Sequence, residues 1–271
     1  MTSRGIQRFL LLLFACMTIV ACKKGNDANN YTIETAPPVA SAITATINTD
    51  CGGFYLVLPS LYESTTKNYP LLLFLHGAGE MGNGSTDLSK LSGNAVLKLV
   101  ANKQFPASFE SGTESFSFVI IEPQFNTWPT TDDVDAVLQY ALDHFRIDRT
   151  RIYISGLSMG GGATWDYAAL HAKSIAAIVP ICGAAIATVD KTKNIASANL
   201  PVWAFHNEDD YTVPVNATTQ FVTMINSYSP VPPAKMTLWP TGGHDAWTKA
   251  TDPTYKEDGM NMYEWMLQFR R

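Results

Sequence analysis

The sequence has few charged residues and no cluster of basic ones. Charged side chains make up 16% of the 271 residues, and the formal net charge at pH 7 is −5. Nucleic-acid-binding domains instead carry basic patches or stripes, so we expect no nucleic-acid partner. The 46% of hydrophobic residues is ordinary for a globular protein with a large buried sheet.

Cysteine is also scarce, with four residues in the whole chain. Cys51 and Cys182 are the two that follow the N-terminal segment, and neither has a Cys or His at the spacing of a metal site. We therefore expect no metal ion. Export would permit a disulfide between these two cysteines, but two buried free thiols are equally compatible, and the spacing leaves that choice open.

The N-terminus has no apolar run long enough to span a membrane. Residues 9–20 form an apolar run of 12 after Arg4 and Arg8, whereas a spanning helix needs about 20 apolar residues. A positive segment followed by a short apolar run is typical of an export signal. The letters IVAC, which end at Cys22, resemble a bacterial lipobox, which implies cleavage before Cys22 and lipid attachment to its sulfur. Ordinary secretory cleavage and an uncleaved anchor are the alternatives.

These features divide the chain into three parts. Residues 1–21 are expected to be a signal peptide of the lipoprotein type, and residues 22–38 are a polar stretch that reads as a flexible tether. Residues 39–271 fit one catalytic α/β domain, because no repeat and no change in composition marks a second one. The expected location is the cell envelope, facing the periplasm or exposed at the cell surface, with the Cys22 lipid in the membrane.

Short apolar runs alternate with helical patterns along the domain, which predicts a mostly parallel sheet with helices on both faces. The predicted strands are residues 43–47, 54–58, 71–75, 118–121, 152–154, 177–181, 202–205 and 236–239. The clearest helix has Thr130 as its N-cap with Asp133 three residues on, and apolar residues follow at helical spacing through Phe145. Further helices are predicted near residues 215–227 and 260–269.

The letters GLSMG, residues 156–160, lie between the strand at 152–154 and a helix-like stretch. A G-x-S-x-G pattern at a strand-to-helix turn is the nucleophile elbow of a serine hydrolase. Gly156 and Gly160 leave room for the sharp turn, Ser158 is the candidate nucleophile, and the Met159 N–H is directed toward a developing oxyanion. The alternative is a glycine-rich turn that carries a serine by chance.

A serine nucleophile needs a base and an acid, which follow it in the order acid, then histidine. His244 is the one histidine that follows both Ser158 and any plausible acid, and it lies just after a predicted strand. The acid comes from the carboxylates of residues 208–210, after another strand. Asp210 is the predicted triad acid, and Asp209 is the alternative.

The second oxyanion donor should come from the loop after the strand at 71–75. That loop reads His76-Gly77-Ala78-Gly79. Its small residues allow the backbone to approach the substrate, and the N–H of Ala78 is the predicted donor, with Gly79 as the neighbouring alternative. His76 precedes the elbow, so a structural hydrogen bond is the expected role for it.

The segments LLLFLHGAGE, EPQF, YISGLSMGGGATW, WAFHNEDDYTVP and GGHDAW together resemble the α/β-hydrolase esterases described as predicted peptidases or as phospholipase/carboxylesterase-like proteins. The likeness extends to feruloyl and acetylxylan esterases and to polyhydroxyalkanoate depolymerases, and it covers roughly residues 55–271. It implies the α/β-hydrolase fold and a Ser-His-Asp triad, but it is loose for the substrate.

The resemblance also bears on the choice of acid. In that family the acid is the aspartate four residues after a histidine and four before a proline, which matches Asp210 between His206 and Pro214. Two positions depart from the family pattern. Asn207 stands where glycine is usual, which can alter the turn but not the chemistry, and Met81 stands where a basic residue is usual, at the outer rim of the pocket.

Two tryptophans lie near these loops. Trp128 and Trp247 could form a platform for a sugar or phenolic ring, or could pack the loops onto the domain. Trp165 and Trp203 lie within a predicted helix and strand and are expected in the core.

The sequence therefore predicts a secreted or lipid-anchored serine hydrolase that cleaves carboxylic esters, of small molecules or of polysaccharides, through Ser158, His244 and Asp210. Carbohydrate-linked acyl or feruloyl esters are the favoured class, and no cofactor is expected. One alternative is a serine peptidase on the same fold, and another is a non-catalytic surface lipoprotein that binds carbohydrate. A complete triad in the right order argues against the second alternative, because binding alone has no chemical need for it.

Overall fold

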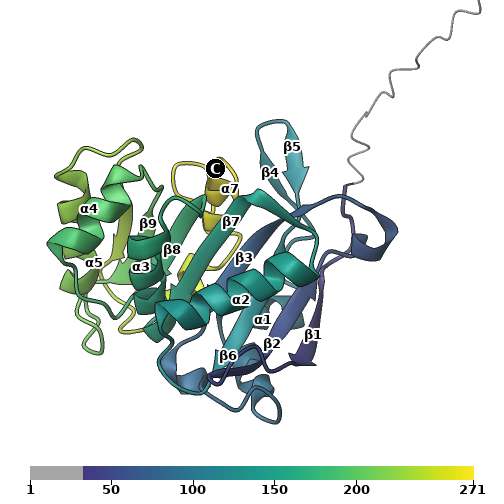
Figure 1. Ribbon diagram of the computed structural model, residues 1–271. Coiled ribbons are helices and arrows are strands. Elements are labelled where there is room, and N and C mark those ends of the chain that lie inside the picture. Colours follow the sequence, from purple (N-terminus) through teal and green to yellow (C-terminus); the bar gives the residue numbers. More distant parts are fainter. Residues whose placement is uncertain (1–32) are drawn as a thin grey trace, which may run out of the picture. The chain divides into compact units, whose positions relative to one another are not determined.

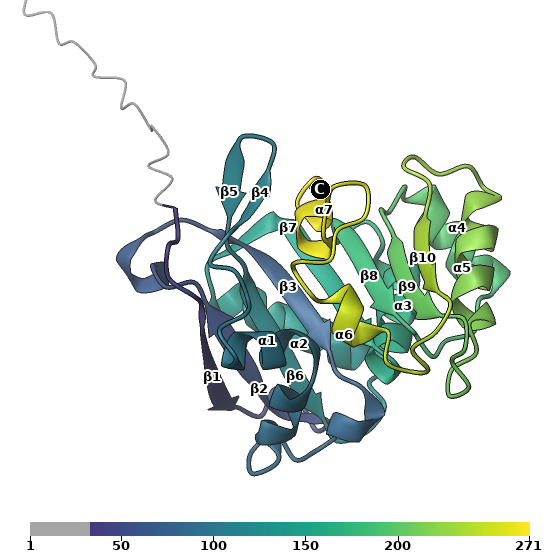
Figure 2. The ribbon, with the colours of Figure 1, turned by 180° about the vertical axis from the view of Figure 1, so that it is seen from behind.

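The structure is a computed structural model that describes residues 33–271. The predicted signal peptide, Cys22 and the first part of the predicted tether lie outside the described residues. Figure 1 shows a central sheet crossed by helices on the near side, and Figure 2 shows the opposite side.

The predicted apolar runs from residue 54 onward coincide with strands, whereas the first strand covers residues 39–44 instead of the predicted 43–47. Two further short strands make a hairpin. The strands are β1 (Val39–Thr44), β2 (Cys51–Leu58), β3 (Tyr69–Leu75), β4 (Phe109–Ser111), β5 (Glu114–Phe116), β6 (Val119–Phe125), β7 (Ile147–Leu157), β8 (Ala177–Ile181), β9 (Trp203–Asn207) and β10 (Lys235–Trp239). The α-helices are α1 (Ala95–Ala101), α2 (Thr131–His144), α3 (Met159–His171), α4 (Val189–Ser197), α5 (Asn216–Asn226), α6 (Trp247–Ala250) and α7 (Met262–Met266). The 3₁₀ helices are η1 (Tyr62–Ser64), η2 (Ala78–Glu80) and η3 (Leu88–Gly93).

The main sheet has 8 strands in the order β1-β2-β6-β3-β7-β8-β9-β10. From β6 to β10 every neighbouring pair runs parallel, while β1 and β2 add an antiparallel edge. Parallel neighbours bring the carboxyl ends of β3, β7, β8, β9 and β10 to one edge of the sheet, where ligands of open α/β sheets bind. The predicted fold class is confirmed.

Each face of the sheet carries its own apolar core. Alternate residues of β3 point to opposite faces, as the period of a strand requires. Leu71, Leu73 and Leu75 belong to the core that also includes residues of α2, α3, α4 and α5, while Leu72 and Phe74 belong to the core that includes residues of α1, α6 and α7. Both sets of helices are visible in Figures 1 and 2. All seven residues of β3 are buried, as a continuous apolar run predicts.

The predicted capping of α2 is confirmed. The Thr130 Oγ1 accepts a hydrogen bond from the Asp133 N–H at 3.3 Å, and the Asp133 carboxylate accepts one from the Thr130 N–H at 2.7 Å. The patterns missed α1, α4 and the β4–β5 hairpin, which are too short to show a clear period. The predicted helix at 260–269 is shorter in the structure, where α7 begins after its Asn261 N-cap and ends at Met266.

The domain begins earlier than the sequence predicted. Glu34, which the prediction placed in the tether at 22–38, is buried, and its carboxylate accepts hydrogen bonds from the Ser60 hydroxyl at 2.7 Å and the Leu61 N–H at 2.8 Å. The compact unit accordingly starts at Ile33. A buried carboxylate that is hydrogen-bonded to residues 60 and 61 cannot belong to a solvated linker.

Two further observations concern the cysteines and the helices. Cys51 and Cys182 are both free and buried, which answers the question that their spacing left open. Among residues 33–271, no helix combines the length and the apolar character needed to cross a membrane.

Candidate active site

Ser158 lies at the turn between β7 and α3, in a backbone conformation that side chains rarely adopt. Its φ is 52° and its ψ is −113°, which costs on the order of 1–3 kcal/mol. The surrounding backbone holds the turn in place. The Ser158 N–H donates to the Ile181 carbonyl at 3.0 Å, and its carbonyl accepts from the Gly162 and Ala184 N–H groups at 2.9 and 3.0 Å.

The two glycines of the elbow are required by space. A Cβ on Gly156 would lie 2.6 Å from the Gly160 carbonyl carbon, and a Cβ on Gly160 would lie 2.0 Å from the Leu75 carbonyl oxygen. Both contacts are far inside van der Waals distance. The turn therefore brings β7, α3 and the end of β3 together only because both positions lack a side chain.

The structure brings Ser158, His244 and Asp210 into one hydrogen-bonded chain. The Ser158 Oγ lies 2.8 Å from the His244 Nε2, and the His244 Nδ1 lies 2.6 Å from the Asp210 Oδ2. An ionised carboxylate can only accept, so Nδ1 carries the proton and Nε2 is free to accept the proton of the serine hydroxyl. The three residues come from the ends of β7, β9 and β10.

Asp210 is buried, and backbone groups fix its orientation. Its Oδ1 accepts from the Thr212 and Val213 N–H groups, each at 2.9 Å. His206 Nε2 lies 3.3 Å from Asp210 Oδ2 and 2.8 Å from the Val213 carbonyl. Burial lowers the pKa of His206, so its imidazole is neutral. The Asp210 carboxylate therefore has no second imidazolium beside it when His244 is protonated.

Asp209 and Asn207 hold the loop that carries His244. The Asp209 carboxylate accepts from the Gly242 and Gly243 N–H groups at 3.3 and 2.8 Å, and the Asn207 side-chain amide donates to the Gly243 carbonyl at 2.9 Å. Asp209, the alternative acid, therefore contacts the backbone before His244. The departure from glycine at residue 207 adds a hydrogen bond to this loop.

The predicted oxyanion donors lie on two sides of Ser158. Met159 is the first residue of α3, and the N–H groups of a helix's first turn have no acceptor within the helix. Ala78 and Gly79 are exposed in η2, directly after Gly77, whose added Cβ would lie 3.7 Å from the Ser158 Cβ. Both predicted donor segments therefore adjoin the nucleophile.

Buried polar side chains support the segment around η2 from below. His76 Nε2 accepts from the Phe125 N–H at 3.0 Å, so its Nδ1–H donates to the Gly77 carbonyl at 2.6 Å. Burial lowers the pKa of His76 to about 4, which keeps the ring neutral. The Glu80 carboxylate accepts from the Gly77 N–H at 2.8 Å and from the Asn94 amide at 2.5 Å. The expected structural role of His76 matches these contacts.

The tryptophans take different places. Trp247 packs edge-to-face on the His244 ring, with centroids 5.3 Å apart, whereas Trp128 is 48% exposed on the loop after β6. Trp165 and Trp203 are fully buried in the two cores, as predicted.

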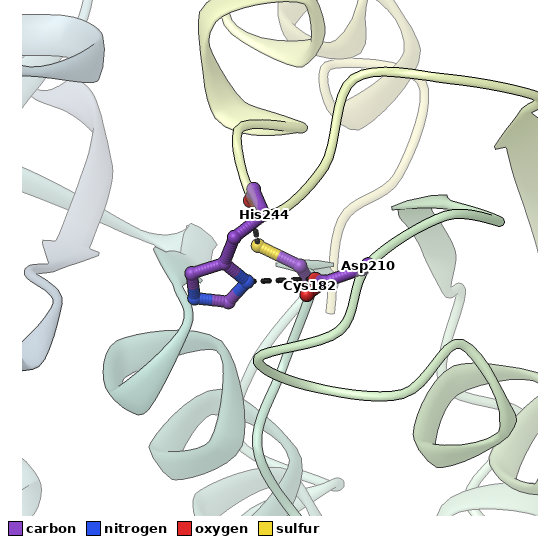
Figure 3. Close-up of side chains that lie close together, drawn as sticks. All are labelled: Cys182, Asp210 and His244. Atoms are coloured by element: carbon purple, nitrogen blue, oxygen red, sulfur yellow. Dashed lines mark hydrogen bonds and ion pairs between the residues drawn. The ribbon is translucent and has the colours of Figure 1, made fainter.

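Sequence reasoning missed three side chains around the site. Glu80 and Gln124 support the η2 segment, and Gln124 donates to the Glu80 carbonyl at 2.9 Å. Cys182, at the end of β8, lies beside His244 and Asp210 (Figure 3). Only the HGAGE and EPQF patterns gave a hint of the first two, because polar residues there interrupt strongly apolar segments.

A sequence model of the phospholipase/carboxylesterase family matches residues 58–252. The chain belongs to this family. It is a serine ester hydrolase with the α/β-hydrolase fold, which confirms the resemblance described from its motifs.

One relative of this carboxylesterase among curated proteins is a bifunctional enzyme by name and matches at low identity. The chain is 26% identical over 157 residues to a bifunctional acetylxylan esterase/xylanase of Neocallimastix patriciarum, a match that covers 55% of this chain and 20% of that protein. It therefore spans about a fifth of that relative's length.

Two solved structures show the same fold. A thermostable esterase superposes with a TM-score of 0.61 at 24% identity, covering 86% of this chain and 63% of the other. A feruloyl esterase module from Clostridium thermocellum, determined with sinapinate, gives a TM-score of 0.55 at 17% identity, covering 76% and 81%.

Proposed function

We propose that this carboxylesterase is an exported lipoprotein that removes acyl groups, such as acetyl or feruloyl groups, from carbohydrate. The observation that carries the catalytic part is the hydrogen-bonded chain from Ser158 through His244 to Asp210, set at the carboxyl edge of the sheet. The substrate class draws support from the names of similar proteins, which include an acetylxylan esterase and a feruloyl esterase module.

The reaction follows from the positions of these atoms. Ser158 Oγ attacks the ester carbonyl while His244 Nε2 takes its proton, and the Asp210 carboxylate stabilises the imidazolium that forms. The N–H groups of Met159 and Ala78 bind the oxyanion. His244 then gives the proton to the leaving alcohol, and a water molecule activated by the same imidazole releases the acid from the acyl-enzyme.

Trp128 and Trp247 are assigned different roles. Trp128 offers an exposed indole face to a sugar or phenolic ring. Trp247 contacts the ring of His244 itself and thereby limits the rotation of the base.

Export and lipid attachment rest on residues 1–22, which lie outside the described residues. The positive start, the short apolar run and the cysteine at its end support attachment at Cys22. Metabolic labelling with a radioactive fatty acid tests this directly. Label should enter the wild-type protein and be absent from Cys22→Ala, and equal labelling of both would contradict the anchor.

The catalytic proposal is tested by a hydrolysis panel with wild type, Ser158→Ala and Ser174→Ala. The panel holds p-nitrophenyl acetate, longer acyl esters, methyl ferulate, acetylated xylan and a peptide amide. Ser174 is an exposed serine beyond α3, so Ser174→Ala is the matched control and should behave as wild type. Loss of Ser158 should reduce kcat/KM by a factor on the order of 10⁴ or more.

The pattern across substrates decides the chemistry. Serine-dependent turnover of acetylated xylan or methyl ferulate supports the carbohydrate-ester proposal. Cleavage of the amide alone would identify a peptidase instead, and full activity in Ser158→Ala would contradict the nucleophile assignment.

A further inference from the structure

A cysteine side chain that the proposed reaction does not use lies beside the two triad residues His244 and Asp210. Cys182 follows β8, is fully buried, and has a φ of 38°. Its thiol donates to the His244 carbonyl at 3.4 Å, so the sulfur lies directly under the residue that carries the base. Figure 3 shows the sulfur, the imidazole and the carboxylate turned toward one space.

The three side chains together form a donor set that Zn²⁺ prefers. One ligand atom from each of Cys182, Asp210 and His244 lies within 4.8 Å of the other two. Zinc binds thiolate sulfur at about 2.3 Å and imidazole nitrogen or carboxylate oxygen at about 2.0–2.2 Å, in a tetrahedral site that often keeps one position for water. Such bonds place neighbouring ligand atoms about 3.3–3.6 Å apart. Binding therefore requires contraction of about 1 Å on the sulfur side, and it requires His244 Nδ1 and Asp210 Oδ2, which are 2.6 Å apart, to separate by about 0.8 Å.

The spacing of Cys182, Asp210 and His244 along the chain gave no sign of a metal site. Cys182 has no histidine or cysteine near it in sequence, and His244 follows it by 62 residues. The parallel sheet brings the ends of β8, β9 and β10 side by side, and each end contributes one ligand.

We propose that a thiophilic divalent cation such as Zn²⁺ or Cd²⁺ binds Cys182 Sγ, the Asp210 carboxylate and His244 Nδ1, and thereby switches the esterase off. The inhibitory part rests on the proposed catalytic function, whereas binding of the metal rests on the three ligands alone. Metal on Nδ1 replaces the hydrogen bond between His244 and Asp210, which the reaction needs.

The proton balance explains the inhibition. The cation takes the place of the thiol proton of Cys182, which is released to solvent. The imidazole proton moves from Nδ1, where the metal binds, to Nε2, and the ring stays neutral. A protonated Nε2 cannot accept the proton of Ser158, so the nucleophile loses its base.

Binding requires the loop that carries His244 to move, against the hydrogen bonds that Asp209 and Asn207 make to Gly242 and Gly243. The His244 side chain is 21% exposed, whereas Asp210 and Cys182 are buried, so the imidazole is the ligand that a cation from solvent meets first. Gly242 and Gly243 precede His244 with φ values of 145° and 58°, and glycine imposes little cost on a change of backbone angles.

The thiol also predicts which cations act. Soft or borderline ions such as Cd²⁺ and Zn²⁺ bind thiolate, whereas Mg²⁺ and Ca²⁺ require oxygen ligands. Cys51 provides the matched control, because it is equally buried but lies on β2, where its thiol donates to the Gly53 carbonyl at 3.5 Å.

Binding is tested by Cd²⁺ titration of chelator-treated, dialysed protein, followed through the ultraviolet charge-transfer band of the Cd–thiolate bond. The band should appear in wild type, Cys51→Ser and Ser158→Ala, and disappear in Cys182→Ser. Circular dichroism checks the fold of each variant, and Cys182→Ala replaces Cys182→Ser if the latter is unfolded. A band that persists without Cys182, or no band in wild type, would overturn the site.

Inhibition is tested on the hydrolysis of p-nitrophenyl acetate. The Zn²⁺ concentration for half-inhibition should rise about 10-fold or more in Cys182→Ser and stay at the wild-type value in Cys51→Ser. Mg²⁺ at the same concentrations should leave the rate unchanged. Equal Zn²⁺ sensitivity with and without Cys182 would contradict the inhibitory role. If the protein proves inactive on every ester, the Cd²⁺ titration still decides whether the site exists.

Discussion

The backbone at Ser158 stores strain that the surrounding chain must offset. Three hydrogen bonds from neighbouring strands and turns hold the residue at its positive φ, and two glycines leave the space for it. The strain projects the hydroxyl away from the end of β7 and toward His244. A relaxed turn would lower the energy of the backbone but would remove the nucleophile from its base.

Two adjacent aspartates make different contacts, and this difference predicts different mutant phenotypes. Asp210→Asn removes the charge that fixes the His244 tautomer, so kcat/KM should fall by a factor on the order of 10⁴. Asp209→Asn keeps one side-chain oxygen, which can still accept the shorter hydrogen bond from the Gly243 N–H, and gives up the longer one from Gly242. It should lose less than about tenfold. Steady-state kinetics on p-nitrophenyl acetate measures both values. The assignment is wrong if the ranking of the two variants is reversed.

At the scale of secondary-structure elements, η2 depends on side chains that lie beneath it. The Glu80 carboxylate receives the Gly77 N–H, and the His76 ring donates to the Gly77 carbonyl, so both sides of one peptide segment are fixed. Ala78 and Gly79 follow this fixed peptide, which adjoins Ser158, so their N–H groups are held beside the nucleophile. Preorganised donors of this kind stabilise a developing oxyanion without reorganisation.

Glu80 is therefore predicted to act as a positioning residue. Glu80→Ala should lower kcat roughly 10- to 100-fold, while KM changes less. The reason is that a displaced N–H donor weakens the hydrogen bond to the oxyanion, which forms mainly in the transition state. Glu80→Gln retains an oxygen for the Gly77 N–H and should keep most of the activity. Measurement of kcat and KM separately distinguishes this role from simple destabilisation. Wild-type kcat in Glu80→Ala would exclude it.

At the scale of the whole molecule, one ionisable group lies within the core between the sheet and α7. Glu122, on β6, is 2% exposed, and its Oε2 has no hydrogen-bond partner among residues 33–271. Burial, with a smaller contribution from the nearby Glu80 charge, raises the pKa of Glu122 well above its usual 4.5. Between pH 4.5 and the raised pKa, Glu122 is therefore protonated in the folded protein and ionised in the unfolded chain.

This proton makes stability depend on pH in a defined direction. The contribution of Glu122 is complete below about pH 4.5, and it is lost as the pH rises toward the raised pKa, by at most about 1.4 kcal/mol per unit. Glu122→Gln removes that loss, so its free energy of unfolding should fall less than that of wild type above pH 4.5. Urea unfolding across this range measures the difference. Glu110→Gln, at an exposed glutamate, should follow the wild-type slope, and parallel curves for all three proteins would refute the prediction.

The sequence was sufficient for the elements with a strong pattern. The strands with continuous apolar runs and the capped helix α2 were predicted because burial on two faces and local capping leave direct traces in the order of residues. The hairpin β4–β5 and the helices α1 and α4 were missed, since three to nine residues carry too little periodicity. Glu34 shows a further limit, because its burial depends on Ser60 and Leu61 and not on its polar neighbours.

What the sequence by itself determined is the local chemistry: the glycine-flanked Ser158, the order of serine, acid and histidine, and the alternation that requires a covered parallel sheet. Tertiary structure alone decided that Asp209 holds the loop before His244, that Glu80 and His76 fix η2, and that Cys182 faces the triad. The reason is geometric. Hydrogen bonds and metal ligation act over about 3 Å, and the sheet brings together strand ends that lie tens of residues apart along the chain.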